Sequence, residues 1–436
     1  MQVFLHTFGC KANQYDTETV RQAIESAGAR ITADPSTADA AVINSCTVTR
    51  EAEAKMRGMV RRIARARPGV RTVVMGCAAA LDDGTIAALP GVTDVVAGGS
   101  VSGVMAALDL PMPADRLLRS FQQVGRGWLR IQDGCDEHCT FCATTRARGA
   151  SRSRPVDDIV AEARLLSAAS AELVITGIHI GSYGLEAGGE TLGALLQVLV
   201  SEVPTVRFRL SSLEATEVDE EIERLMVERP DRLAPHLHAP LQSGSDRVLR
   251  RMGRHWYSAR TYQERIERLA SELPVFGLGA DVMVGFPDET DGDHRATVSL
   301  IESLPFTYLH VFPYSERPGT AASRLGQAVE PSVVAERSAE LRELGCAKQA
   351  SHIAQRAGST ADLVVTGRTR GRFTAMTEDY LDVAVTTDEV VQSRFDGRLE
   401  LGSDGLKSLA PRTSHLAPQL QSLAPRTSHL APSVHA

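Results

Sequence analysis

The residues best suited to chemistry are three cysteines in one short stretch of the chain. Cys135, Cys139 and Cys142 follow the spacing C-x3-C-x2-C. Thiolates this close repel one another and oxidise readily, so a metal centre is expected to hold them. Iron–sulfur clusters are bound by cysteines at such short spacings. Three thiolates leave one iron of a four-iron cluster without a protein ligand, and an open iron can bind a small molecule.

Two other interpretations of this stretch compete with a cluster. One is a structural zinc site with His138 as the fourth ligand. The other is chance clustering of buried cysteines. His138 directly precedes Cys139, which makes a tetrahedron difficult to close, and the second ligand pair typical of zinc motifs is missing. The spacing therefore favours an iron–sulfur cluster.

The C-x3-C-x2-C loop resembles the signature of the radical S-adenosylmethionine (SAM) enzymes. This resemblance implies a [4Fe-4S] cluster on Cys135, Cys139 and Cys142 whose open iron chelates the methionine end of SAM. In that family, one electron from the cluster cleaves SAM to methionine and a 5′-deoxyadenosyl radical. The protein positions the cofactor and excludes water.

Three more cysteines each follow a predicted strand near the N-terminus. The strands at 3–7, 40–44 and 72–75 alternate with helical patterns, which predicts a parallel α/β sheet. Asp16 or Thr17 is expected to cap the first helix. Ligands bind at the carboxyl ends of such strands, so Cys10, Cys46 and Cys77 are expected to converge as ligands of a second cluster. For any one of them alone, a small buried hydrophobic residue is the simpler interpretation.

Two cysteine triads together resemble the radical SAM methylthiotransferases. The runs 7–18, 44–49 and 176–184 look like those of the tRNA threonylcarbamoyladenosine subgroup. The resemblance implies two [4Fe-4S] clusters, SAM, a tRNA substrate and transfer of a methylthio group to C2 of N6-threonylcarbamoyladenosine at position 37. It also implies an electron donor, which the sequence does not identify. Thr145 and Arg146 depart from the family pattern, where Pro-Tyr is expected, and leave open an effect on substrate choice.

Three alternative functions remain open at this stage. The same chemistry fits isopentenyladenosine of tRNA or a ribosomal-protein side chain as substrate. A non-catalytic, zinc-dependent RNA-binding protein is an alternative of another class.

The central segment contains six strand-like runs, at 128–131, 173–176, 206–210, 236–238, 279–284 and 308–312, most of them separated by helical patterns. Six β/α repeats predict a partial barrel with its chemistry at the carboxyl ends of the strands. Phe141, inside the cluster loop, is a candidate to pack on adenine or in the core. The residues at the strand ends are candidate SAM contacts: Thr176, Gly177, Ser211, Ser212, Glu214, Gln242, Val284 and Gly285.

The sequence predicts four parts along the chain. Residues 1–112 form the N-terminal parallel α/β domain, and 120–352 form the partial (β/α)6 radical SAM barrel. Residues 356–402 resemble the small antiparallel β-barrel (TRAM-like) that this family uses to bind RNA, with Phe373 or Tyr380 available for stacking. Residues 403–436 repeat an 11-residue Ser/Pro-containing segment and are expected to be a disordered tail.

Composition and charge limit the remaining choices. The 436 residues are 43% hydrophobic with a net charge of −7, so any nucleic-acid contact must come from a local patch. Arg57, Arg61 and Arg65 share one predicted helix face, which is either such a phosphate-contact patch or an ordinary solvated face. Seven cysteines, no secretory signal and no apolar run of about 18 residues predict a cytoplasmic protein without a membrane partner.

Overall fold

The computed structural model describes residues 1–47, 50–115, 117–120, 125–369, 372–386, 393–402 and 405–409. Val48 and Thr49 of the motif after Cys46, and residues 410–436 with most of the predicted tail, lie outside these ranges. Among the described residues, no helix combines the length and the apolar character needed to cross a membrane.

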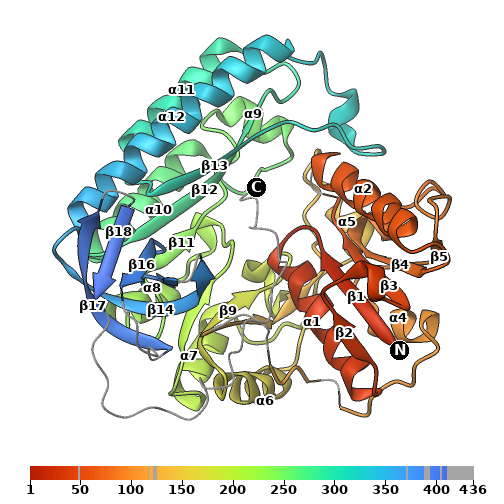
Figure 1. Cartoon of the computed structure of the whole chain (residues 1–436). Coiled ribbons are helices and arrows are strands. Elements are labelled where there is room, and N and C mark those ends of the chain that lie inside the picture. The colour runs from red at the N-terminus through yellow and green to blue at the C-terminus, as the bar shows by residue number, and fades with distance from the viewer. Residues whose placement is uncertain are drawn as a thin grey trace.

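The N-terminal domain is a parallel sheet of order β2-β1-β3-β4-β5, with helices on both faces (Figure 1). Its strands are β1 (Gln2–Thr7), β2 (Arg30–Thr32), β3 (Ala40–Ser45), β4 (Arg71–Gly76) and β5 (Val92–Ala97). Its helices are α1 (Lys11–Ser26), α2 (Arg50–Ala66), α3 (Cys77–Ala80) and α4 (Val101–Ala107). Alternate strand residues enter two apolar cores: Ile43 packs with Met56 of α2, and Val42 packs with Val20 of α1.

The predicted start of the first helix is wrong. Helix α1 begins at Lys11, and Cys10 occupies its N-cap position. Asp16 lies inside the helix, fully buried, and pairs with Arg130 and Arg148 of the next domain. Ion pairs with the next domain therefore account for the buried position of Asp16, whereas its place in the sequence had suggested a helix cap.

The central domain has the predicted six parallel strands, in two sheets of order β10-β9-β6 and β11-β12-β13. A parallel bridge between Ser212 and His238 connects the two sheets, so the strands form an open barrel. The strands are β6 (Gly125–Arg130), β9 (Ser170–Thr176), β10 (Arg207–Leu210), β11 (His236–His238), β12 (Gly277–Val284) and β13 (Tyr308–Pro313), with the short pair β7 (Gln132–Asp133) and β8 (Arg152–Ser153) beside them.

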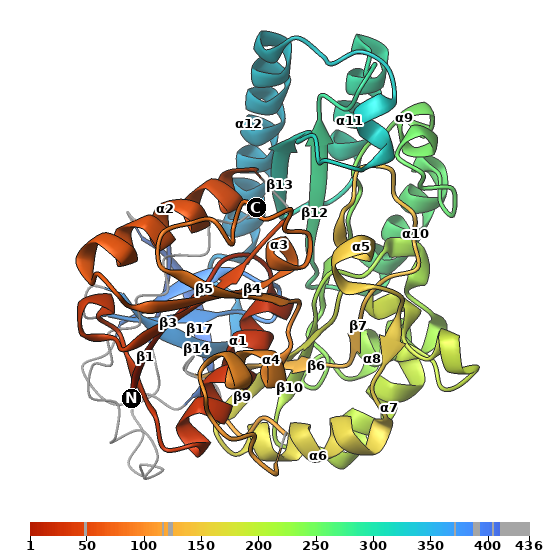
Figure 2. The same cartoon turned by 90° about the vertical axis from the view of Figure 1, so that its right-hand side faces the viewer.

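Helices cover the outside of this barrel (Figure 2). They are α6 (Val156–Ser167), α7 (Leu192–Glu202), α8 (Glu220–Glu228), α9 (Asp246–Arg251), α10 (Ala259–Glu272), α11 (Asp291–Ser303) and α12 (Pro331–Arg356). The short helix α5 (Thr144–Arg148) lies instead beside α3 of the N-terminal domain. In β12, Leu278, Ala280 and Val282 join the apolar core beneath the helices. Since side chains alternate along a strand, Asp281 faces the barrel interior.

The C-terminal domain is a closed barrel of order β14-β15-β16-β18-β17. Its strands are β14 (Thr360–Thr369), β15 (Arg372–Met376), β16 (Asp382–Thr386), β17 (Arg394–Gly402) and β18 (Gly405–Leu409). The pair β16–β18 is parallel and the other pairs are antiparallel, so the barrel is mixed where an antiparallel one was predicted. The predicted tail boundary at 403 is also wrong, because β18 closes the barrel.

Candidate active site

The loop that carries the first cysteine triad is folded tightly against its own continuation. The amide of Cys135 donates to the carbonyl of Gly149 at 3.1 Å, and that of Cys142 donates to Cys139 at 3.1 Å. Gly134 has φ +76°, and a Cβ there would lie 1.9 Å from the carbonyl oxygen of Ala150. Only glycine permits this approach, which places Cys135 at the mouth of the barrel.

Each thiol of this triad has a different polar neighbour. Cys135 Sγ lies 3.9 Å from Nδ1 of His179, and Cys142 Sγ accepts the amide of Thr144 at 3.3 Å. Cys139 Sγ lies 3.7 Å from Nη1 of Arg254. Burial raises the pKa of the Cys139 thiol to about 12, although Arg254 opposes this effect. A bound metal ion would reverse that preference, because a coordinating thiol gives up its proton.

His179 is held in its cationic form beside Cys135. Its Nε2 lies 2.6 Å from Oε1 of Glu217. Burial alone would lower its pKa, but the hydrogen bonds with Cys135 and Glu217 raise the pKa of His179 to about 10. A cationic imidazole is electrostatically suited to a negatively charged thiolate cluster.

The second triad gathers around the buried side chain of Asn13. Its Nδ2 donates to the carbonyls of Phe8 at 2.9 Å and Ser45 at 3.0 Å, which ties the ends of β1 and β3 together. Its Oδ1 lies 3.8 Å from Cys77 Sγ, at the start of α3. Gly9 has φ +104°, and a Cβ there would lie 2.8 Å from Cys46 Sγ. Glycine therefore lets the turn before Cys10 lie against Cys46.

Cys10, Cys46 and Cys77 follow the carboxyl ends of β1, β3 and β4, so they lie at one edge of the sheet. Burial raises the pKa of the Cys77 thiol to about 11, and the charge of Cys10 acts in the same direction. No disulfide joins any of the seven cysteines, all of which lie in the described part of the chain.

The spacing of the thiols argues against a single zinc ion. Among the described residues, only one group of three potential metal ligands has its ligand atoms within 4.8 Å of one another, and it contains no cysteine. A tetrahedral zinc ion with Zn–S bonds of about 2.3 Å would hold sulfur atoms closer than that. In a four-iron cluster each thiolate binds a separate iron, so a cluster does not require its ligand sulfur atoms to lie that close together.

Arg148, the last residue of α5, connects the two triads. Its Nε lies 3.2 Å from Cys77 Sγ, and its Nη2 donates to Asn13 Oδ1 and Asp16 Oδ2, both at 2.7 Å. Its Nη1 donates to Asp133 Oδ1 at 3.0 Å. The side chain is 1% exposed. One guanidinium therefore joins the loop that follows Cys142 to the residues around Cys77.

The sequence did not distinguish Arg148 from its neighbours. Arg146, Arg148, Arg152 and Arg154 lie close together in the sequence, and this pattern fits either an anion-binding rim or a solvated loop. In the structure Arg152 is exposed, Arg146 donates to the carbonyl of Pro318, and Arg154 pairs with Glu162. A run of arginines carries no local signal for which member becomes buried.

The predicted SAM contacts lie along the carboxyl ends of the strands. Glu214 is buried and accepts hydrogen bonds from Arg254 and Trp256. Burial raises the pKa of Glu214, although Arg254 opposes this. A Cβ on Gly177 would lie 2.9 Å from Gln132 Oε1. The remaining predicted contacts are Thr176, Ser211, Gln242 and Val284, which are buried, Phe141, which is half-buried, Ser212, which is exposed, and Gly285, whose amide donates to Glu289.

Among these residues, Gln242 has features that suit a ligand, and Phe141 has features that suit the core. Gln242 has φ +60°, and its buried Oε1 has no hydrogen-bond partner among the described residues. An unpaired buried acceptor costs stability unless something else satisfies it. Phe141 packs on the apolar cluster that contains Met252 and Phe286, which agrees with its alternative role in the core.

Arg317 is a site residue that the sequence did not reveal. It is 5% exposed, and Nε and Nη2 have no partner among the described residues. Burial lowers the pKa of Arg317, and the charges of Glu53 and, to a lesser extent, Cys46 oppose this. Glu53 Oε2 lies 3.6 Å from Nη1. Buried donors within electrostatic reach of Cys46 fit an anionic group, such as an iron–sulfur cluster, at the second triad.

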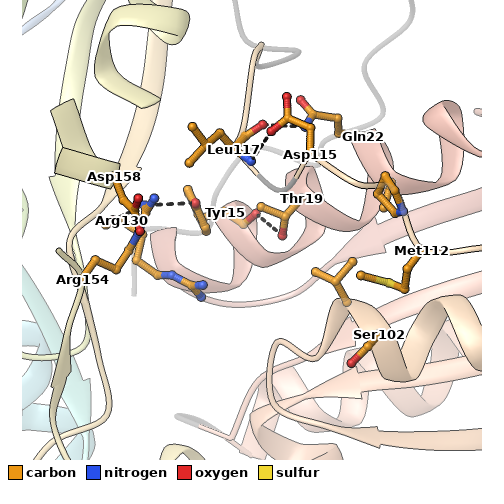
Figure 3. Close-up of a pocket in the computed structure, with 13 residues that line it drawn as sticks. Tyr15, Thr19, Gln22, Ser102, Met112, Asp115, Leu117, Arg130, Arg154 and Asp158 are labelled. Carbon is orange, nitrogen blue, oxygen red and sulfur yellow. Dashed lines mark hydrogen bonds between the residues drawn. The ribbon is translucent and has the colours of Figure 1, made fainter. Parts of the chain in front are cut away.

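Two cavities lie between the N-terminal domain and the barrel. The one in Figure 3 has a volume of about 410 Å³; Arg130 and Arg154 line its barrel side, and Tyr15 of α1 faces them. None of the six triad cysteines lines it. The other, of about 290 Å³, is lined in part by Arg130 and Arg148. Thus only the smaller cavity touches the residue that joins the triads.

Comparison with known proteins agrees with this arrangement. Residues 2–98 match the model of "Uncharacterized protein family UPF0004", and residues 129–301 match the Radical SAM superfamily. The fold is similar to that of the radical SAM methyltransferase TsrM from Kitasatospora setae, with a TM-score of 0.56 at 15% identity over 74% of this chain and 76% of that one.

The sequence relatives cover most of the chain. The threonylcarbamoyladenosine tRNA methylthiotransferase MtaB of Bacillus subtilis is 38% identical over 77% of this chain and 78% of its own. MtaB of Thermotoga maritima is 36% identical over 78% and 81%. The tRNA-2-methylthio-N(6)-dimethylallyladenosine synthase of Coxiella burnetii is 32% identical over 84% and 88%. This chain therefore belongs to the radical SAM methylthiotransferase family.

Proposed function

We propose that this protein is a tRNA methylthiotransferase that adds a methylthio group to C2 of N6-threonylcarbamoyladenosine. The observation that carries the proposal is the pair of cysteine triads, one on each domain, joined by the buried guanidinium of Arg148. Transfer of both sulfur and a methyl group needs two centres close together. The two most similar relatives described above carry this activity in their names.

The proposed ligands are Cys135, Cys139 and Cys142 for one [4Fe-4S] cluster and Cys10, Cys46 and Cys77 for a second. When bound, the clusters and SAM would supply the one-electron chemistry that activates a C–H bond. His179, Arg254 and Arg148 place positive charge beside three of the six thiols. Such charges stabilise a negatively charged centre and influence its reduction potential.

Helix α2 provides a candidate surface for the tRNA backbone. Arg61, Arg62 and Arg65 are exposed, whereas Arg57 is engaged with Glu53. The N-terminal end of α2 contacts the loop after β13, where Arg50 pairs with Glu316 at 3.4 Å. The helix therefore extends outward from the mouth of the barrel, and its exposed arginines suit phosphate contacts. Six reduced thiols also suit the reducing cytoplasm, where tRNA is found.

Iron counting combined with product analysis tests the proposal. After anaerobic reconstitution, the wild-type protein should bind about eight irons, as two four-iron clusters. Cys77→Ala and Cys135→Ala should each keep about half of the iron and form no methylthio product on threonylcarbamoylated RNA, measured by mass spectrometry. Cys346→Ala is the matched control, because Cys346 is an exposed cysteine on α12 far along the chain from both triads.

Three results would contradict the proposal. Zinc without iron in the wild-type protein would favour a binding protein. A Cys77→Ala protein that keeps all of its iron would show that Cys77 does not hold a second cluster. A wild-type protein that modifies dimethylallyladenosine RNA but not threonylcarbamoylated RNA would assign it to the other tRNA substrate.

A further inference from the structure

A second group of chemically active side chains lies inside the barrel, apart from the cysteines. Nε2 of His238 and Nδ1 of His310 each lie 3.2 Å from Oδ1 of Asp281. The hydroxyl of Tyr308 lies 3.1 Å from Nδ1 of His238 and 2.9 Å from Nε2 of His236. These residues come from three neighbouring strands, β11, β12 and β13, and we call His238, Asp281, Tyr308 and His310 the histidine cluster.

The histidine cluster is deep in the fold but remains accessible. The side chains of Asp281 and His310 are 26% and 20% exposed, and that of His238 is 10% exposed. Charged residues at such depth are usually sealed by their partners. Asp281 is accessible although it lies in the middle of β12, with its neighbours Ala280 and Val282 fully buried. Open space in the barrel must therefore reach this carboxylate.

The histidine cluster lies next to the proposed reaction site. The amide of Gln242, a proposed SAM contact, donates to the carbonyl of Asp281 at 2.8 Å. The cluster thus lies beside a residue of the proposed SAM site.

The polar groups of the histidine cluster match one of the two kinds of modified adenosine better than the other. In adenine, N6 is bonded to C6, C6 is bonded to N1, and N1 is bonded to C2. A group on N6 therefore lies close to C2, the reacting carbon. A threonylcarbamoyl group carries a carboxylate, a hydroxyl and urea N–H groups. The imidazoles and the phenol can donate to its oxygens, and Asp281 can accept from its N–H or hydroxyl. A dimethylallyl group has no polar atoms, so it would exclude water from these polar groups without offering them a hydrogen bond.

We infer that the histidine cluster binds the polar N6 substituent and makes the enzyme specific for threonylcarbamoyladenosine. This inference rests on the proposed function and adds the residues that choose the substrate. The main rival is a divalent-cation site, because the ligand atoms of His238, Asp281 and His310 lie within 4.8 Å of one another. The substrate assignment is favoured because Tyr308 adds a hydroxyl, 3.1 Å from Nδ1 of His238, that a cation site does not need.

His310→Phe tests the inference with two anticodon stem-loop RNAs, one threonylcarbamoylated and one dimethylallylated. The variant should raise the KM for the threonylcarbamoylated RNA by roughly 10- to 100-fold, because a buried hydrogen bond to the substituent is lost. Its iron content and its reductive cleavage of SAM without RNA should match the wild type. The dimethylallylated RNA should bind the variant at least as well as it binds the wild type.

His294→Phe is the matched control. His294 also pairs with a carboxylate, Glu340 at 2.7 Å, but it lies on α11 outside the barrel. This variant should keep the wild-type KM for both RNAs. A loss of activity in both variants with loss of iron would indicate a folding defect, and the milder His310→Asn, which keeps a hydrogen-bonding group, should then recover iron and part of the RNA preference.

Equilibrium binding of both RNAs to protein without SAM separates this inference from the proposed function. If the wild type prefers the threonylcarbamoylated RNA and His310→Phe does not, the inference stands even without turnover. If the wild type shows no preference, or His310→Phe keeps it, the inference is wrong. A stoichiometric divalent metal that the wild type binds and His310→Phe loses would also overturn it, in favour of the cation site. If binding shows the preference but no product forms, the proposed function alone fails.

Discussion

The barrel encloses two polar clusters, and they are built in opposite ways. In the half formed by β6, β9 and β10, Glu172 accepts hydrogen bonds from Arg126 at 2.8 Å, Arg207 at 2.8 Å and Arg209 at 3.0 Å. Its side chain is 0% exposed. In the half formed by β11, β12 and β13, the carboxylate of Asp281 has two histidine partners and is 26% exposed. One carboxylate is sealed and the other is open.

The C-terminal domain seals the first cluster. Arg207 donates to Asp362 at 2.7 Å, and Arg209 donates to the carbonyl of Thr377 at 2.8 Å. Tyr380 of the same turn stacks on His236, with ring centroids 4.4 Å apart. The expectation that Tyr380 is available to stack on RNA is therefore wrong, because its ring packs against the central barrel.

This difference indicates that the Glu172 cluster supports the fold, whereas the histidine cluster is suited to recognising a substrate. A buried carboxylate with three guanidinium partners holds two domains together and has no free capacity for a ligand. A carboxylate that keeps access to the interior can still exchange its partners for those of a substrate. The comparison predicts that mutations in the first cluster reduce stability, whereas mutations in the second change substrate binding.

The largest effect is expected from Glu172→Gln. The substitution removes the counter-charge that three buried arginines share, and among them Arg207 keeps Asp362 as a carboxylate partner. The loss should lower the free energy of unfolding by about 3–5 kcal/mol. Chemical denaturation followed by circular dichroism measures this loss. Glu202→Gln is the control, because its partner Arg164 is exposed and surface ion pairs contribute little. A Glu172→Gln protein as stable as the wild type would contradict the supporting role.

Stability should also fall at acidic pH because of this cluster. Burial alone would raise the pKa of Glu172, but Arg209, Arg207 and Arg126 lower it well below its ordinary value of 4.5. A depressed carboxylate pKa adds stability above the unfolded pKa, and this stability is lost as the pH falls through the folded pKa. Unfolding midpoints between about pH 6 and pH 3 should therefore decline less steeply in Glu172→Gln than in the wild type.

The Glu172→Gln protein should still lose some stability as the pH falls. Burial would raise the pKa of Asp281, yet His238 and His310 lower it well below the ordinary value of 3.8. This carboxylate acts in the same direction as Glu172. Equal slopes in the two proteins would show that Glu172 is not the sealed, ionised group described above.

The smallest effect is expected from Tyr308→Phe. The substitution removes one hydroxyl but keeps the ring that packs on Tyr380, so stability should change by only about 1 kcal/mol. Loss of the contact to His238 should still raise the KM for threonylcarbamoylated RNA by a few-fold. Steady-state kinetics and thermal unfolding on the same protein preparation separate the two effects. A large loss of stability with an unchanged KM would make the histidine cluster a second supporting element.

Much of the site could be predicted from sequence because its signals are local. The C-x3-C-x2-C loop lies within eight residues, and each of Cys10, Cys46 and Cys77 comes within three residues of the end of a strand whose apolar pattern is clear. The six central strands were also predictable, since apolar runs separated by helical patterns mark them individually. These features depend on neighbours in the chain, which composition and spacing reveal.

Other site residues could not be predicted, because their partners are distant in the chain. Arg148 reaches Asn13 and Asp16 across more than 130 positions, and Arg317 lies within reach of Cys46. One signal was present but not used: Asp281 and His310 interrupt otherwise apolar strands, which marks a polar barrel interior. The closing strand β18 was missed because it joins the parallel partner β16, which lies before β17 in the chain.

The sequence by itself determined the two cysteine triads, the order of the α/β repeats and the family, because spacing and periodicity are properties of neighbouring residues. Only the tertiary structure decided which arginine is buried between the triads, which carboxylate is sealed and which stays open. Those outcomes depend on how completely other segments exclude water from a charged group, and exclusion is a property of the packed domains rather than of any single stretch of chain.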